Sequence, residues 1–473
     1  MAFRFPRLTE EQSRKICWAS LEILERVGVR LFLDEAIGLL KKAGARVTDG
    51  NLVHLPSHLI EKALSTVPKK VVLFDRYHYP AMPIEGDNCF YGPGSDCLNV
   101  VDLRTGIRRK PILKDMREGL ALCDALLNID FVMSLLLPID VNTAIADRCQ
   151  MEAMLSSTIK PIIFGAHDFE GCNDCVEMAE TVAGGEEALR EKPFVACCIN
   201  VVSGLRHNKE GLEKLLYLAS KNLPVLYIPS STAGVASPST PAGSMALDYA
   251  GVFVGLTLAQ LKREGAPVIV TGIPPGHLDM RTLVSPCCEP ERGTTEALSH
   301  FYKLPMFSVG GASDSKIVDQ QAAAEAALGL LVETLAGANI IHGLGSLESG
   351  LTFSLSQLAI CDEIVSWIKA FGRDIEVDDE GLALDVIAEV GPDGQFLHTE
   401  HTIRHYRERW YPEIFERETH DAWVRRGGKS LLERAQERVE HVLADHKVED
   451  LPRDIKKRLR KIIRRAEKKV KRQ

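Results

Sequence analysis

The chain has 473 residues, of which 45% are hydrophobic and 26% charged, and its formal net charge at pH 7 is -8. These values are typical of a globular protein, and the negative charge argues against nucleic acid as the main partner. We find no apolar run long enough to span a membrane and no signal-peptide pattern. Twelve cysteines in a chain of this length indicate buried thiols in a reducing cytoplasm rather than a disulfide scaffold.

Residues 1–85 are predicted to form a mostly helical region. Thr9 and Gln12 have the spacing of a capping box, and apolar residues follow them at helical period. Two further helices are predicted at 34–45 and 56–67. Short extended pieces, NLVHL and KKVVLFD, flank the last of these helices. The spacing of apolar residues along the sequence changes after this region.

Residues 86–372 alternate short apolar runs with longer helical patterns. Continuous apolar runs of four to eight residues are typical of parallel strands covered on both faces. Eight such strand–helix units predict a (β/α)8 TIM-type barrel. A doubly wound open sheet is the alternative, but it would normally carry a GxGxxG fingerprint after its first strand, which is missing here. The predicted strands lie within 87–96, 131–138, 161–168, 194–204, 224–234, 267–276, 305–314 and 339–349.

Residues 373–473 are charged and predicted to form a helical extension that packs on the barrel or on another subunit. Its last stretch, DIKKRLRKIIRRAEKKVKRQ, is strongly basic and has apolar residues at helical spacing. We interpret it as an amphipathic C-terminal helix. Docking of this helix onto an acidic protein or a polyanion is the alternative. The added terminal helices offer much packing surface, so we expect a homo-oligomer.

A TIM-type barrel carries its working residues at the carboxyl ends of its strands. This rule selects the polar residues of the loops, including the run from Ser313 to Lys316 after the seventh strand. Structural roles are the alternative, above all helix capping by Asp140, Asp168 and Asp319. The candidate substrate-binding residues are Tyr91, Asp96, His167, Asn200, Tyr227, His277, Arg281, Asp314, Lys316, His342, Glu348 and Phe353.

No covalent catalyst is evident in the sequence. No serine has a nucleophile-elbow pattern, and no cysteine has an obvious base beside it. Cys172 and Cys175 form a CxxC without the second pair that a structural zinc site usually needs. Cys287, Cys288 and His277 are potential zinc ligands only if the fold brings them together. We therefore predict a barrel enzyme for a small molecule, without a bound metal.

Six separated motifs resemble, in order, the trimethylamine methyltransferase superfamily of corrinoid-dependent methyltransferases. The resemblance covers residues 10–370. It implies a (β/α)8 barrel that moves a methyl group from an amine to cobalt on a separate corrinoid protein. The chain lacks the D-x-H-x-x-G signature of a cobalamin-binding protein, so cobalamin is expected on the partner. The motifs are ASLEILERVGVRL, EAIGLLKKAGARV, HLPSHLIEKAL, YGPGSDCLNVVDLRTGIRRKPILKDMREGLALCDALLNID, GHLDMRTLVSPCCEPE and GGASDSKIVDQQAAAEA.

The chain departs from the trimethylamine branch in one respect. Trimethylamine-using members carry pyrrolysine inside the barrel, whereas every residue here is standard. The chain is therefore more similar to the glycine betaine branch, which implies glycine betaine as substrate and dimethylglycine as product. Proline betaine, carnitine and γ-butyrobetaine are alternative substrates. A zinc-dependent barrel methyltransferase and a non-catalytic quaternary-amine-binding protein are the alternative functions.

The resemblance also implies roles for the candidate residues. A quaternary ammonium is already activated, so cobalt(I) attacks a methyl group directly, and the enzyme desolvates and aims the cation. Aromatic faces would hold the cation. Asp96, Asp314 or Glu348 would balance its charge. A betaine carboxylate would bind His342 first, with His277, Lys316 and Arg281 as other donors. The aromatic candidates are Tyr91, Phe164, Tyr227, Phe307 and Phe353.

Overall fold

The computed structural model describes residues 5–201 and 203–470, and its centre is a parallel β-barrel. Seven strands pair in the order β6-β17-β16-β14-β12-β10-β9. Residues 131–136 close the ring, because Val132 bridges Ile162 in parallel and the Asp130 N–H donates to the Tyr91 carbonyl (2.7 Å). The predicted (β/α)8 barrel is thus confirmed. The named strands are β6 (Phe90–Pro93), β9 (Ile162–Gly165), β10 (Val195–Val201), β12 (Val225–Pro229), β14 (Val268–Thr271), β16 (Met306–Val309) and β17 (Ile340–Leu344).

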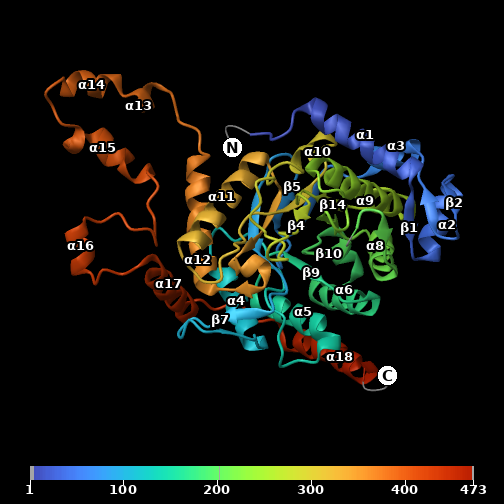
Figure 1. Cartoon of the computed structure of the whole chain (residues 1–473). Helices are drawn as coiled ribbons and strands as arrows, with labels where there is room; N and C mark the ends of the chain where they lie inside the picture. The colour runs from blue at the N-terminus through green and yellow to red at the C-terminus, as the bar shows by residue number, and fades with distance from the viewer. Residues whose placement is uncertain (1–4, 202, 471–473) are drawn as a thin grey trace.

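Helices surround the barrel (Figure 1). Two of them begin at predicted caps, because Asp168 accepts the Gly171 N–H (2.7 Å) and Asp319 accepts the Ala322 N–H (2.9 Å). Asp140 likewise accepts the Leu113 N–H (2.8 Å) at the start of α4. The helices are α4 (Leu113–Ala125), α5 (Ala146–Ser157), α6 (Phe169–Ala183), α7 (Glu186–Glu191), α8 (Lys209–Lys221), α9 (Pro241–Lys262), α10 (Glu296–Phe301), α11 (Gln320–Ala336) and α12 (Leu355–Phe371).

The amino-terminal end of the barrel is closed. The hairpin of β4 (Val71–Phe74) and β5 (Pro80–Ile84) shares one apolar cluster with inward-facing residues of the strands. Phe74 N–H donates to the carbonyl of Pro193, just before β10, which places the hairpin at the strands' starting ends. A ligand must therefore enter the barrel from the carboxyl ends of the strands.

The N-terminal region contains more strand than we predicted. Its capping box is confirmed, because Thr9 Oγ1 accepts the Gln12 N–H (3.2 Å) and Gln12 Oε1 accepts the Thr9 N–H (2.9 Å). It also contributes three strands to a small sheet, completed by β11 (Arg206–His207) from the barrel segment. Its helices α1, α2 and α3 all pack on α9. The elements are α1 (Glu10–Arg26), β1 (Val29–Leu31), α2 (Asp34–Ala43), β2 (Arg46–Thr48), β3 (Leu52–His54) and α3 (Ser57–Thr66).

Helix α9 corrects our expectation that no segment has the length and hydropathy of a membrane span. Its 22 residues meet both criteria. However, 83% of the apolar window is buried inside the protein, where α9 packs against α1, α2, α3 and α8. Its apolar surface is therefore used as core.

The C-terminal extension leaves the barrel and returns to it (Figure 1). Helix α17 packs on α12 and α4, and α18 packs on α6. The amphipathic terminal helix is confirmed, because Leu459, Ile462 and Ala466 of α18 are buried. Arg465 on the same helix forms an ion pair with Asp174 of α6 (2.6 Å). The helices are α13 (Asp379–Leu382), α14 (Leu384–Val390), α15 (Glu400–His405), α16 (His420–Arg425), α17 (Leu431–Asp445) and α18 (Arg453–Val470).

Candidate active site

Three candidate residues face the open end of the barrel: Asp96, Asn200 and His342. Side chains alternate along a strand, and Ala196, Cys198 and Ile340 belong to the interior cluster. Asn200 and His342 therefore share the inner face. Asp96 lies beside Gly165, the last residue of β9. A Cβ atom added at Gly165 would lie 3.9 Å from Asp96 Oδ2. Asp96 and Asn200 are exposed and His342 is half-buried, so solvent reaches this end.

His342 stacks on Phe307, with ring centroids 4.3 Å apart. Its Nδ1 lies 2.7 Å from the Ser308 carbonyl, which only accepts, so Nδ1 carries the proton. Desolvation in the barrel lowers the pKa of His342 to about 4. The ring is consequently neutral at pH 7, and Nε2 is an acceptor. Our expectation of a His342 donor for a carboxylate is not met by this neutral ring.

The backbone of Asp96 is strained. It is left-handed, with φ of 56°, a conformation that non-glycine residues adopt mostly in turns and at functional sites. Ser134 Oγ (2.8 Å) and Gln150 Nε2 (2.9 Å) both donate to Oδ1. Desolvation raises the pKa of Asp96, although these hydrogen bonds lower it in part. The Asp96 carboxylate has no cationic partner among the described residues, so it could pair with a bound cation.

The expectation for the aromatic residues needs correction. Phe307 belongs to the interior cluster, but the other candidates pack outside it. The Tyr91 hydroxyl meets Thr334 of α11 (2.9 Å), and Tyr227 stacks on the buried His207. Successive strand residues face opposite sides, so a place near a strand end does not decide the face. The misplaced candidates are Tyr91, Phe164, Tyr227 and Phe353.

The charged candidates of the loops lie on the rim rather than inside the mouth. The Arg281 side chain is 90% exposed, and Lys316 is exposed and donates to the Asp314 carbonyl (2.6 Å). His277 Nδ1 lies 3.0 Å from Glu289 Oε2. The expectation that these residues bind the substrate therefore stays a prediction.

Glu348 and His167 also lie at the edge. Glu348 is paired with Arg108 (2.9 Å), so its charge is already balanced, and its role as a counter-ion stays a prediction. His167 is exposed and lines a rim pocket of about 460 Å³ together with Asn200 and Lys214. Asn200 thus connects the rim with the barrel interior.

The Ser313–Lys316 run joins two loops at the mouth. Asp314 accepts the N–H groups of Cys287 (2.9 Å) and Cys288 (3.1 Å) and the Ser349 hydroxyl (2.6 Å). Burial raises the pKa of Asp314, but these hydrogen bonds outweigh it and leave the pKa below its usual value. The polar run therefore serves the architecture of the mouth, and Asp314 is unavailable as a counter-ion.

Two groups of described residues have spacing suitable for a metal ion. Ligand atoms of Cys287, Cys288 and Asp314 lie within 4.8 Å of one another, and the two Sγ atoms are 3.6 Å apart. The neighbouring thiol and burial raise the pKa of Cys287, which favours thiols over the thiolates that zinc binds. His277 is not part of this group. The second group is Glu380, His401 and His405 on the C-terminal extension.

A buried carboxyl pair behind β16 escaped our sequence reasoning. Ser308 Oγ lies 2.8 Å from Glu296 Oε1 and 2.6 Å from Glu333 Oε2. One hydroxyl proton cannot serve both contacts, so one carboxyl must be protonated. Burial and the Glu333 charge raise the pKa of Glu296 well above its usual range, which assigns the proton to Glu296. Ser134 and Gln150, which donate hydrogen bonds to Asp96, also lie in no recognisable sequence motif.

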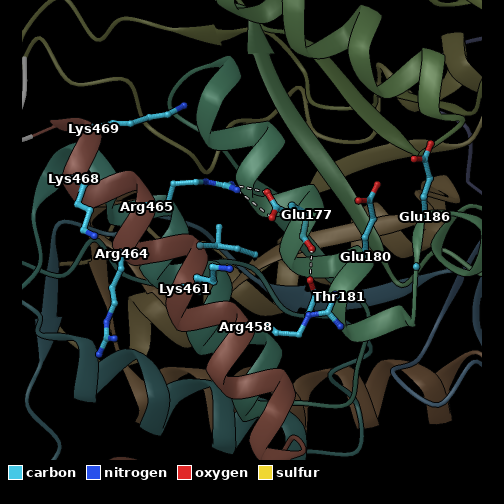
Figure 2. Close-up of a pocket in the computed structure, with 12 residues that line it drawn as sticks. Glu177, Glu180, Thr181, Glu186, Arg458, Lys461, Arg464, Arg465, Lys468 and Lys469 are labelled. Carbon is cyan, nitrogen blue, oxygen red and sulfur yellow. Dashed lines mark hydrogen bonds and ion pairs between the residues drawn. The ribbon is translucent and has the colours of Figure 1, made fainter.

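A pocket of about 910 Å³ lies outside the barrel, between α6 and α18 (Figure 2). Glu177, Glu180 and Glu186 form one side of it, and basic residues of α18 form the other. Lys221 and Arg465 already pair with these acids. None of the residues at the barrel mouth lines this pocket, so it is not part of the candidate active site.

Comparisons with known proteins give one consistent result. The family model "Trimethylamine methyltransferase (MTTB)" matches residues 3–471. A trimethylamine methyltransferase MttB of Desulfitobacterium hafniense (strain DSM 10664 / DCB-2) is 31% identical over 470 residues, which are 98% of this chain and 95% of that protein. A glycine betaine methyltransferase of D. hafniense (strain Y51) is 30% identical over 473 residues, 98% and 97% of the two chains.

A solved structure agrees at the level of the fold. The monomethylamine methyltransferase MtmB of Methanosarcina barkeri superposes with a TM-score of 0.50 and 11% sequence identity. The match covers 94% of this chain and 90% of that one. Likeness at this identity shows the fold alone.

Proposed function

The chain belongs to the trimethylamine methyltransferase (MTTB) family, and on this premise we propose that it transfers a methyl group from glycine betaine to cobalt(I) of a separate corrinoid protein. Dimethylglycine is the second product. The observation that carries the choice of a quaternary amine is the open end of the barrel, which holds the Asp96 carboxylate without a cationic partner among the described residues and the half-buried His342 stacked on Phe307. We assign the reaction to the cytoplasm.

Each side of this site suits a quaternary ammonium. Asp96 would supply the negative charge, and the stacked rings of His342 and Phe307 would supply cation–π attraction of about 0.5–2 kcal/mol. With a pKa of about 4, His342 is neutral at pH 7 and does not repel the cation. The cation leaves water for this lining, with one methyl group directed toward the open end.

Asn200 is the donor that we assign to the betaine carboxylate. Its Oδ1 lies 3.9 Å from Cys198 Sγ, which leaves the Nδ2 hydrogens available to an anion. His342 would join it only after taking up a proton, because its neutral Nε2 accepts. The low pKa makes that proton uptake costly unless the bound carboxylate stabilises the imidazolium.

The proposed transfer needs no base from this chain. Cobalt(I) supplies the electron pair of the new bond to carbon, and the electrons of the broken C–N bond leave with the neutral tertiary amine. The described mouth residues accordingly act by binding, orientation and exclusion of water. The hairpin of β4 and β5 closes the amino-terminal end of the barrel, so the corrinoid protein must approach the carboxyl ends of the strands.

The test is a methyl-transfer assay with the purified protein. The corrinoid protein in its cobalt(I) state is mixed with glycine betaine, and the cobalt(I) absorbance is followed as methylcobalt forms. Trimethylamine, proline betaine, carnitine and γ-butyrobetaine are run in parallel. Transfer from glycine betaine supports the proposal, and transfer from another amine alone changes the substrate. No transfer from any amine to a competent corrinoid protein rejects the methyltransferase reaction.

Zinc-dependent transfer is the second candidate, supported by the spacing of Cys287, Cys288 and Asp314 and opposed by the raised pKa of Cys287. Stoichiometric zinc in the purified protein, with activity lost on chelation and restored by zinc, would support it. Binding of betaines without transfer would instead indicate a quaternary-amine-binding protein.

Phe307→Leu is expected to raise KM for glycine betaine by roughly 2- to 30-fold, because it removes one ring of the aromatic stack that attracts the cation by about 0.5–2 kcal/mol. Steady-state methyl transfer measures the change. Phe353→Leu is the matched control, since Phe353 packs outside the barrel interior. Equal KM values for the two variants would show that the cation does not contact Phe307.

A further inference from the structure

Residues 374–408 form an arm that projects from the body of the protein (Figure 1). It contains α13, α14 and α15. Among the described residues, every hydrogen bond and ion pair of this arm joins it to itself, such as those of Glu380 with Arg404 (2.7 Å) and His405 (3.0 Å). The chain reattaches just beyond, where Trp410 Nε1 donates to Ser366 of α12 (2.9 Å).

The arm exposes more apolar side chains than a free segment of this kind can sustain. Its helices have 4, 7 and 6 residues, and isolated helices shorter than about 12 residues are marginal in water. Ile375 is 87% exposed and Leu397 69%. Such a segment needs a surface to pack against. The exposed apolar residues of the arm are Ile375, Val377, Leu382, Leu384, Ile387, Phe396, Leu397, Ile403 and Tyr406.

We propose that the arm packs against a second copy of this chain, and that the two copies exchange arms. The body also presents apolar side chains, Trp367 near the end of α12 and Leu328 on the neighbouring α11, both more than half exposed. In a two-fold dimer each copy contributes both surfaces, so every arm and every body patch is covered at once.

The available surface is large enough for a stable dimer. A standard interface buries about 800 Å² on each partner. The nine exposed apolar side chains of the arm would reach that value if each buried about 90 Å². The body patch adds to this area, so a stable dimer does not require every apolar side chain of the arm to be fully buried.

The position of the arm favours a second copy over the corrinoid protein. Helices of a (β/α)8 barrel run antiparallel to its strands, so α12 ends at the barrel's amino-terminal side. The arm begins there, and the mouth that receives the corrinoid protein opens on the other side. The exchange is also independent of the proposed reaction, and it is tested on the chain alone.

The test compares particle masses by light scattering. The wild-type chain, of 52.2 kDa, is expected at twice its mass. The triple variant Leu384→Ser, Leu397→Ser, Ile403→Ser should raise the dimer dissociation constant by at least about 100-fold, because each loses buried apolar area. The control variant Val27→Ser, Ile107→Ser, Val235→Ser changes equally exposed apolar residues elsewhere and should remain dimeric. Far-ultraviolet circular dichroism checks folding.

Limited trypsin digestion gives a second readout on the wild-type chain. Cleavage at Arg404 and Arg407 should accelerate as the protein is diluted and arms are released. A wild-type monomer at tens of micromolar overturns the proposal, as does a dimer that survives the arm substitutions. An arm that becomes protected only when the corrinoid protein is added overturns it in favour of that partner.

Discussion

Asp96→Asn is expected to lower kcat/KM for the quaternary amine by roughly 30- to 1000-fold. Removing one partner of a desolvated charge pair costs about 2–4 kcal/mol. Asp96 Oδ2 lies beside Gly165 at the carboxyl end of β9, and the carboxylate has no cationic partner among the described residues, so we expect it to balance the substrate ammonium. Asparagine tolerates the left-handed backbone at this position, with φ of 56°, so the fold should be retained.

The pH dependence distinguishes a charge effect from a structural one. The pKa of Asp96 is raised by desolvation, so the wild-type carboxylate is protonated as the pH falls through that raised value. Affinity for the cation is then lost toward acid pH and regained as the pH rises. The Asp96→Asn variant should lack this pH dependence of kcat/KM. Asp140→Asn, which removes a carboxylate that caps α4, is the control and should retain wild-type kinetics. An unchanged pH profile in Asp96→Asn would show that Asp96 does not contact the cation.

Arg148→Met is expected to lower the free energy of unfolding by about 3–5 kcal/mol, the usual cost of breaking a buried ion pair from one side. Only 5% of the Arg148 side chain is exposed. Its guanidinium reaches Asp147 (2.9 Å), Asp174 (3.2 Å) and Asp168 (3.6 Å), which joins α5 to the start of α6. Methionine fills the space but leaves two buried carboxylates without this cation. Urea unfolding at pH 7 measures the loss.

The control for Arg148 is a more exposed pair in the same helical layer. Arg117 pairs with Glu152 while 37% of its side chain is exposed, so Arg117→Met should cost no more than about 1 kcal/mol. Asp174 also pairs with Arg465 of α18. Equal losses for the two variants would mean that Arg465 compensates for Arg148 and that the buried cluster is not the main link.

Local features of the fold were predictable because they are encoded by neighbouring residues. The capping box of Thr9 and Gln12 and the cap of Asp319 each need only a side chain and a backbone N–H three residues away. The eight strands were recognisable from runs of apolar residues, since both faces of barrel strands are covered. The sequence by itself therefore determined the barrel, its order of elements and the end at which its polar loops gather.

The face of each strand was decided only by the tertiary structure. The same double covering that makes barrel strands recognisable makes their two faces equally apolar, so Tyr227 and Phe307 looked alike in sequence. Packing sends Tyr227 toward His207 and Phe307 toward His342. Charge pairing across loops was equally hidden, because the Arg108 that neutralises Glu348 is 240 residues away in the chain. Side-chain direction and long-range partners depend on which elements meet in space, and no local pattern records that.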